Sequence, residues 1–230
     1  PDTWVARTPN EARQLVDSLS ARGMDVVKAY EMLQRDVFLA LIDRAKQRGL
    51  PVVAHVPLAM DASEVSALGV RSLEHLRNLE LACSSVADSL RVARTTRLAI
   101  EAAKPDTRGL AFDWSLGYGP GALIRAAIHR DQRPRALAMR DSLRCNALLR
   151  TFFQNGTWQT PTLFLIQRVY LRVDTMATVR KASRYVPAST WELWEVGARK
   201  ADEMTAETRA VLEQQANWHF EIVRALKKAG

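Results

Sequence analysis

Cysteine and long apolar runs are both scarce in this chain of 230 residues. The two cysteines, Cys83 and Cys145, are too few for a disulfide-rich scaffold and lack CxxC spacing, so we predict two free, buried thiols. No apolar run approaches the ~18 residues that span a bilayer, and no charged leader with a cleavage site opens the chain. We therefore expect a soluble protein with no membrane partner. The compartment, a bacterial-type cytoplasm or periplasm, stays unknown, and because Pro1 stands first, removal of a leader stays open.

Acidic residues are fewer than basic ones, 25 against 33, which gives a formal net charge of +8. Most of the excess lies between residues 81 and 155, which contain twelve Lys and Arg but six Asp and Glu. These basic residues are spread through a helical pattern with few aromatic residues between them, and no nucleic-acid-binding motif is recognisable. Such a distribution is typical of solvated helix faces, so we expect no nucleic-acid partner.

The first third of the chain alternates helices and strands. Thr8, Pro9 and Glu11 form a Thr-x-x-Glu capping pattern at the start of a helix that ends at Gly23. Apolar runs predict strands over 24–30, 51–56 and 70–76, with helices over 33–48 and from Asp61 or Ser63 between them. This alternation predicts parallel strands joined by right-handed crossovers, in an α/β barrel or a doubly wound sheet.

The rest of the chain is mainly helical. We predict a helix from Ser84 or Ser85 to about 103, a Gly/Pro-rich loop over 113–121, a single helix over 133–156, a fourth strand over 157–166 and a final helix over 205–228. We expect the whole chain, 1–230, to form the central portion of one α/β domain, with helical insertions at about 81–155 and 166–228.

Three of the predicted strands end in a residue that can bind a metal or become a metal ligand: Lys28, His55 and His75. They are separated by 27 and 20 residues, near the ~30 residues of one βα unit. The carboxyl ends of parallel strands lie on one side of a sheet, so the three side chains are expected to converge. Neutral imidazole is a common zinc ligand, and a lysine on a buried strand needs a partner or a changed protonation state.

Five stretches resemble the amidohydrolase superfamily: "TPNEARQLVDSLSARGMDVVKAY", "AKQRGLPVVAHVP", "ASEVSALGVRSLEHL", "NGTWQTPTL" and "LKKAG". Within it, the likeness is to the branch of imidazolonepropionase-like and Xaa-Pro or Xaa-Arg/Lys dipeptidase-like enzymes. The block from Thr8 to Leu76 is the specific part, and the helical stretches 87–150 and 166–210 match loosely.

This resemblance implies a metallo-dependent hydrolase on a partial (β/α)8 TIM-type barrel, covering about strands four to seven. It matches Lys28 to a carboxylated lysine on strand four that bridges two divalent metals, with Zn²⁺ expected. It matches His55 and His75 to the histidine ligands of strands five and six. The metals activate water as hydroxide. Tyr30, Thr160 and Thr162 are weaker candidates for the substrate pocket.

The departures from the family pattern concern the rest of the metal centre. The family carries an HxH pair on strand one and a GTD-like aspartate on strand eight, and the chain has neither. The remaining histidines, His129 and His219, lie in helical pattern, where we expect a surface or packing role. No catalytic residue beyond the ligands is therefore assigned.

Two functions follow from these observations. The first is a metal-dependent hydrolase of an amide (C–N) bond in a dipeptide, N-acyl amino acid or cyclic amide, with part of its site on this chain and weak or no activity alone. The second is a truncated or degenerate barrel that acts as a non-catalytic binding or assembly partner. In either case, open sheet edges would need a covering, by a homo-oligomer or by missing flanking segments.

Overall fold

The computed structural model describes residues 4–102, 120–163, 181, 183–192, 195 and 203–229. The chain divides into two compact units, each described here by itself. The first unit comprises Pro1–Phe112, Tyr118–Thr160 and Ala229–Gly230, and the second comprises Asp113–Gly117 and Pro161–Lys228. The predicted Gly/Pro-rich loop lies almost entirely outside the described residues, as do the end of the fourth predicted strand and much of the 166–228 insertion.

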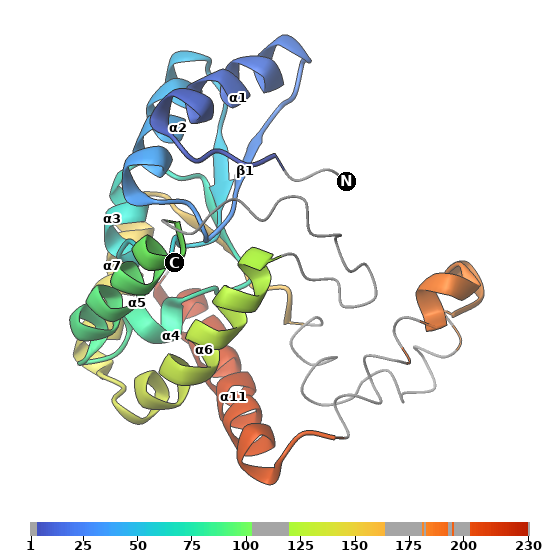
Figure 1. Ribbon diagram of the computed structural model, residues 1–230. Helices are drawn as coiled ribbons and strands as arrows, with labels where there is room; N and C mark the ends of the chain where they lie inside the picture. The colour runs from blue at the N-terminus through green and yellow to red at the C-terminus, as the bar shows by residue number, and fades with distance from the viewer. Residues whose placement is uncertain are drawn as a thin grey trace. The chain divides into compact units, whose positions relative to one another are not determined.

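A parallel sheet organises the first unit (Figure 1). Its strands, in spatial as well as chain order, are β1 (Val27–Ala29), β2 (Val52–Ala54), β3 (Ser72–Glu74) and β4 (Trp158–Thr160). Each lies inside a predicted strand, so the mixed α/β class and the parallel pairing are confirmed. Closure into a barrel stays a prediction, because the described residues supply these four strands.

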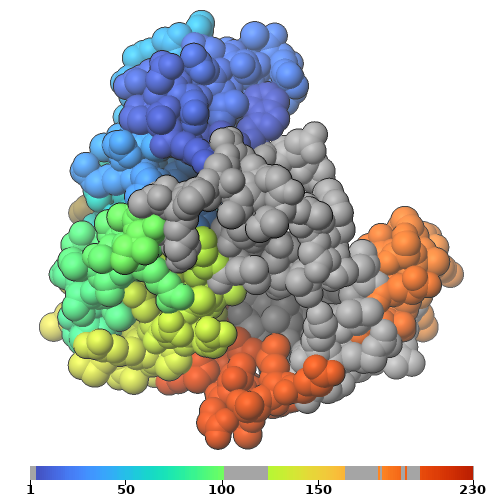
Figure 2. Space-filling model, viewed as in Figure 1, coloured from blue at the N-terminus to red at the C-terminus, as the bar shows by residue number. Residues whose placement is uncertain are grey.

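Seven helices of the described residues accompany the sheet in the first unit. They are α1 (Pro9–Ala21), α2 (Arg35–Gln47), α3 (Ala62–Ala67), α4 (Leu79–Ala82), α5 (Ala87–Ala102), α6 (Pro120–Ala138) and α7 (Ser142–Gln154). Helices α1 and α2 pack side by side (Figure 1) and form one blue region of the surface in Figure 2. Helix α3 packs against α7, and α4 packs against α6.

The start of α1 follows the predicted cap. The Thr8 hydroxyl accepts a hydrogen bond from the Glu11 amide at 3.2 Å, and Pro9 occupies the first turn, where a missing N–H costs nothing. The Glu11 carboxylate accepts from the Arg7 amide at 2.7 Å, one residue before the cap. Sequence alone therefore located this helix start.

The two faces of the sheet differ in burial. Val27, Ala29, Val52 and Ala54 point to one face and are at most 5% exposed. Because parallel partners share a face, the strand register places Lys28, Val53 and Ser72 together on the other. That second face is more open and more polar, and it carries Lys28, one of the residues predicted to bind metal.

The single helix predicted over 133–156 is wrong: the structure has two helices there. Helix α6 ends at Ala138, and α7 begins after Asp141, whose side chain accepts from the amides of Leu143 and Arg144. Aspartate is a strong N-cap, and its carboxylate satisfies amides that would otherwise need a preceding turn. Arg140, in the break, forms an isolated antiparallel bridge with Ser84.

The prediction of two free thiols is also wrong. Cys83 and Cys145 form a disulfide, with their Cα atoms 4.4 Å apart across a sequence separation of 62 residues. Cys83 follows α4 and Cys145 lies in the first turns of α7, so the bond joins two elements that sequence spacing does not bring together.

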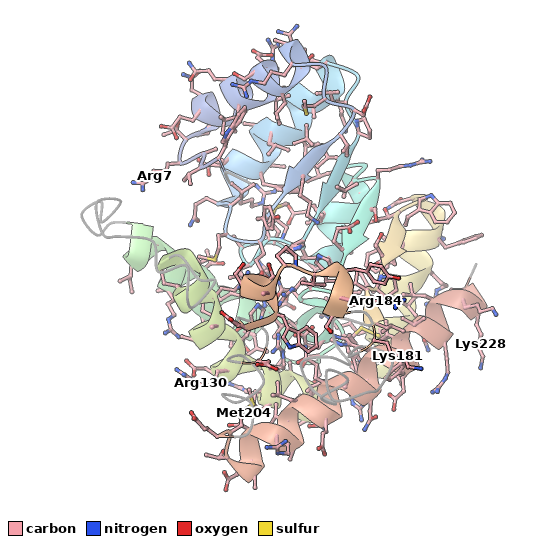
Figure 3. All side chains as sticks on the ribbon, turned by 90° about the vertical axis from the view of Figure 1, so that its right-hand side faces the viewer. Arg7, Arg130, Lys181, Arg184, Met204 and Lys228 are labelled. Atoms are coloured by element: carbon pink, nitrogen blue, oxygen red, sulfur yellow. A yellow bond between two sulfur atoms is a disulfide. The ribbon has the colours of Figure 1, made fainter. Side chains whose placement is uncertain are left out.

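In the second unit the longest described element is α11 (Ala206–Ala229), which matches the predicted final helix. Met204 and Lys228 mark its two ends in Figure 3. Its buried side chains are Gln215, Ala216, Trp218, His219 and Ile222. A short 3-10 helix, η2 (Ser183–Tyr185), belongs to the same unit. Among the described residues, no helix has the length and apolar character needed to cross a membrane.

Candidate functional site

Two of the predicted metal ligands lie in contact at the carboxyl ends of neighbouring strands. The ring centroids of His55 and His75 are 5.1 Å apart, in an edge-to-face arrangement. The His55 amide donates to Ala29 of β1, and the His75 amide donates to Thr160 of β4, so both residues extend the strand ladder by one position. Lys28 lies on β1, on the face that His55 also occupies.

Tyr30 joins this group, whereas the two threonines differ in their surroundings. The ring of Tyr30 lies 5.0 Å from the His55 ring, and the Lys28 ammonium lies 5.7 Å from the Tyr30 ring. Tyr30 is 47% exposed, which leaves part of its ring open to a ligand. Thr160 touches the site through its carbonyl, which accepts from His75. Thr162 belongs to the second unit.

A polar strip crosses the same face of the sheet from β4 to β3. The Ser72 hydroxyl donates to Glu74 at 2.7 Å, so at 3.0 Å from Thr160 it must accept the proton of the Thr160 hydroxyl. The charge of Glu74 favours the protonated form of Lys28. Sequence analysis did not identify Ser72 or Glu74, because alternation alone does not distinguish a functional polar residue from a solvated one.

Burial lowers the pKa values of the three predicted ligands. The pKa of Lys28 falls because burial disfavours its ammonium, although Glu74 opposes the effect. Burial lowers the pKa of His55, and burial together with the charges of His55 and Lys28 lowers the pKa of His75 to about 4. Both imidazoles are therefore neutral near pH 7, the protonation state that a metal ligand requires.

The backbone is strained where β3 ends. His75, Leu76 and Asn78 have φ values of 61°, 52° and 65°, in the left-handed region that favours glycine. Asparagine and histidine are found in this region more often than most residues, but leucine is uncommon there. Such outliers cluster at functional sites, where the surrounding structure holds them in place.

A buried carboxylate lies behind the histidines. Glu31 follows β1 and is 1% exposed. Its carboxylate accepts from Asn78 at 3.2 Å and from Arg125 at 3.3 Å, and Nε2 of His129 lies 3.3 Å from it. Burial alone would raise the pKa of Glu31, but the contact with His129 and the nearby His55 imidazole outweigh burial and hold it well below its ordinary value. His129 thus has the packing role that was one of the two predicted for it.

The loop after His55 is held by an arginine from α5. The buried Arg94 side chain donates through Nε to the Leu58 carbonyl and through Nη2 to the Met60 carbonyl at 3.4 Å. The Leu58 amide in turn donates to the Glu31 carbonyl at 2.8 Å. The predicted insertion 81–155 therefore supplies contacts that hold the end of the site in position.

The donor set fits part of a metal centre. Both ring nitrogens of His55 are buried and have no hydrogen-bond partner among the described residues, which is unusual for an imidazole unless a ligand binds it. No group of three or more His, Cys, Asp or Glu side chains in the described part of the chain could hold a metal ion. His55 and His75 supply two imidazoles, and Lys28 would become a ligand only when carboxylated.

Comparisons with known proteins found one solved structure with a similar fold. No family model and no curated protein matches the chain. The structure is similar to a solved structure named "AH, Bottromycin amidohydrolase", with a TM-score of 0.61 and 21% sequence identity. The alignment covers 99% of this chain and 40% of that one, so the chain spans less than half the length of this neighbour. At this identity the likeness shows the fold alone: a mixed α/β architecture shared with part of an amidohydrolase.

Proposed function

We propose that this chain carries part of the active centre of a metal-dependent hydrolase that cleaves an amide bond. The observation that carries the proposal is the contact between the His55 and His75 imidazoles at adjacent strand ends, with Lys28 on the next strand. The fold likeness to a bottromycin amidohydrolase supports the same reaction class. The remaining ligands of such a centre would come from residues other than Lys28, His55 and His75.

His55 and His75 would each offer a neutral imidazole lone pair. Their lowered pKa values keep those lone pairs free of protons near pH 7. Lys28 would act after carboxylation: its neutral amine attacks carbon dioxide, an N–C bond forms, and a proton leaves to solvent. The lowered pKa of Lys28 favours the neutral amine that this step requires. The resulting carbamate is an anionic oxygen donor.

A divalent metal held there, Zn²⁺ or a similar ion, would lower the pKa of its bound water and polarise a substrate carbonyl. The protein orients the substrate: the half-exposed ring of Tyr30 lies beside both Lys28 and His55 and can pack against an apolar substrate group. Dipeptides, N-acyl amino acids and cyclic amides are the proposed substrate classes. Thr160 and Thr162 remain candidates for further substrate contacts.

The direct test is metal binding by the purified chain. We expect Zn²⁺ or Co²⁺ to bind weakly, and the double substitution His55→Asn/His75→Asn to abolish that binding. The matched control is His219→Gln, which removes a buried histidine of α11 outside the sheet and should leave metal affinity unchanged. Equal affinity in the parent and the double variant would overturn the proposal.

The carboxylation of Lys28 has its own readout. In carbon-13-labelled bicarbonate, the parent chain with added Zn²⁺ should show a carbamate resonance that Lys28→Met lacks. Amide hydrolysis is then assayed on panels of dipeptides, N-acyl amino acids and cyclic amides. Because the chain supplies two imidazoles and one lysine, we expect low turnover from it alone.

A second candidate is a non-catalytic binding or assembly partner. The observation that favours it is apolar exposure at both outer strands: Trp158 of β4 is 67% exposed, and Met24 and Val26, beside β1, are 45% and 43% exposed. Large exposed apolar residues along sheet edges are typical of surfaces that another chain covers. This candidate predicts tight self-association without specific metal binding.

A further inference from the structure

The Glu31 carboxylate is not among the proposed metal ligands, yet it is one of the most completely buried charges in the described residues. A buried carboxylate is costly unless it is paired and hydrogen-bonded. Two elements supply its three partners: Asn78 comes from the segment after β3, and Arg125 and His129 lie one turn apart on α6. So many contacts on one carboxylate indicate that its position is closely fixed.

Helix α6 has a buried side and an exposed side at this point. His129 is 4% exposed and faces Glu31, whereas its neighbour Arg130 projects outward with 77% of its side chain exposed (Figure 3). An ionised carboxylate can only accept hydrogen bonds, so Nε2 of His129 carries the proton that points to Glu31. Asn78 uses the same amide nitrogen to donate to the Val56 carbonyl at 2.7 Å, which ties Glu31 to the residue after His55.

The Glu31 carboxylate also faces one side of the His55 ring. Its Oε1 lies 3.7 Å from Nδ1 of His55, slightly too far for a hydrogen bond but close enough for its charge to act on the ring. A negative acceptor beside Nδ1 favours the tautomer that carries its proton there. Nε2 then keeps its lone pair, and the structure gives it no hydrogen-bond partner among the described residues.

We propose that Glu31 is a positioning residue that fixes His55 in the Nδ1–H tautomer and so directs the Nε2 lone pair to the strand-end site. Arg125 and His129 of α6 hold the carboxylate in place for this role. Ligating histidines commonly donate their second N–H to a carboxylate, which orients the ring and raises its basicity. The inference rests on the proposed function only for the identity of what Nε2 binds.

The test is the tautomer of His55 in the metal-free chain, read from nitrogen-15 NMR at about pH 8, where imidazoles are neutral. The His55 signals are identified by their loss in His55→Asn. We expect the parent to be mainly Nδ1–H and Glu31→Gln to lower the ratio of Nδ1–H to Nε2–H about tenfold, because the substitution removes the negative charge that lies beside Nδ1. An unchanged ratio in a folded Glu31→Gln variant would overturn the proposal.

The matched control is Glu80→Gln. Glu80 is also 1% exposed and pairs with α6 through Arg133 at 2.9 Å, so its substitution disturbs a comparable buried ion pair on the same helix. It should leave the His55 tautomer ratio unchanged. If both variants shift the ratio equally, the effect is loss of packing and the positioning role is refuted.

Two further measurements keep the proposal testable. Should Glu31→Gln fail to fold, Arg125→Met retains the carboxylate, removes one of its anchors, and should shift the ratio in the same direction by a smaller factor. Where the parent binds Co²⁺, Glu31→Gln should weaken binding about 10- to 100-fold, as for other partners of ligating histidines. A tautomer shift in a chain that binds no metal would support the positioning role while refuting the proposed function.

Discussion

His75 ends a strand where the surroundings disfavour a positive charge. Burial is the main cause of its lowered pKa, and the nearby His55, Lys28 and Arg77 add to it. The pKa in the folded chain, about 4, lies below the ordinary value of 6.5, so the unfolded chain takes up this proton first. The stability that a neutral His75 contributes is therefore complete above pH 6.5 and is lost as the pH falls to about 4.

This pH dependence is measurable in the metal-free chain. We expect the His75 ring protons to titrate with a midpoint of about 4 in an NMR experiment. In His75→Asn, the decline of the melting temperature between pH 6.5 and 4 should become shallower. A midpoint near the ordinary value of 6.5 would contradict the burial described for this side chain.

Single residues were predictable from the sequence where their chemistry coincided with a strand end. Lys28, His55 and His75 stand out because a basic or imidazole side chain interrupts an apolar run. Glu31 gave no such signal, because it stands in the polar segment that follows its strand. Its partners Arg125 and His129 are 94 and 98 residues further along the chain, and only the packing of α6 brings them to it.

At the scale of elements, α1 and α2 are joined by one carboxylate. Asp17 of α1 accepts from Arg44 at 2.7 Å and from Arg48 at 2.6 Å, both on the side of α2. These hydrogen bonds lower the pKa of Asp17 to about 2. Because its folded pKa lies below that of the unfolded chain, the ion pair stabilises the fold above about pH 4, and this contribution is lost as the pH falls to about 2.

Replacement of Asp17 by Asn should remove this contribution. We expect Asp17→Asn to lower the urea midpoint at pH 7 modestly, since the group is solvent-accessible, and the two proteins to converge in stability as the pH approaches 2. Added salt should narrow the difference at pH 7 because it screens exposed charges. Asp43→Asn, on the same helix as Arg44, is the control and should have a smaller effect.

Helix limits were predictable where a cap marked them. Thr8 and Pro9 identified the start of α1, and Gly23, with φ of 70°, follows its end as expected. Asp141 carried the same kind of signal for α7, but the apolar periodicity on either side of it favoured one continuous helix. The predicted start at 133 is also wrong, because α6 begins at Pro120 and contains Pro134 in its interior.

At the scale of the whole first unit, the disulfide is the largest constraint that sequence reasoning missed. Two cysteines 62 residues apart carry no pairing signal, and their approach depends on α4 and α7 packing together. A loop of this length predicts a stabilisation of roughly 4 kcal/mol through the restricted unfolded chain.

Reduction of this bond should therefore be visible in equilibrium unfolding. We expect a reductant to lower the free energy of unfolding of the parent by up to roughly 4 kcal/mol. Cys83→Ser/Cys145→Ser should match the reduced parent and be insensitive to reductant. Identical unfolding curves for the parent with and without reductant would contradict a disulfide between these residues.

The open edges of the sheet decide between the two candidate functions. In the described part of the chain, β4 pairs on one side with β3, and Trp158 on it is 67% exposed. The non-catalytic candidate predicts that a second copy covers this edge, so sedimentation velocity should show concentration-dependent association that Trp158→Lys weakens about tenfold or more, as for a buried aromatic anchor. Phe153→Lys is the matched control, because Phe153 is 63% exposed on α7 rather than on the sheet. A parent that stays monomeric removes the main support for that candidate, whereas equal effects of both lysines indicate general apolar association rather than an interface at β4.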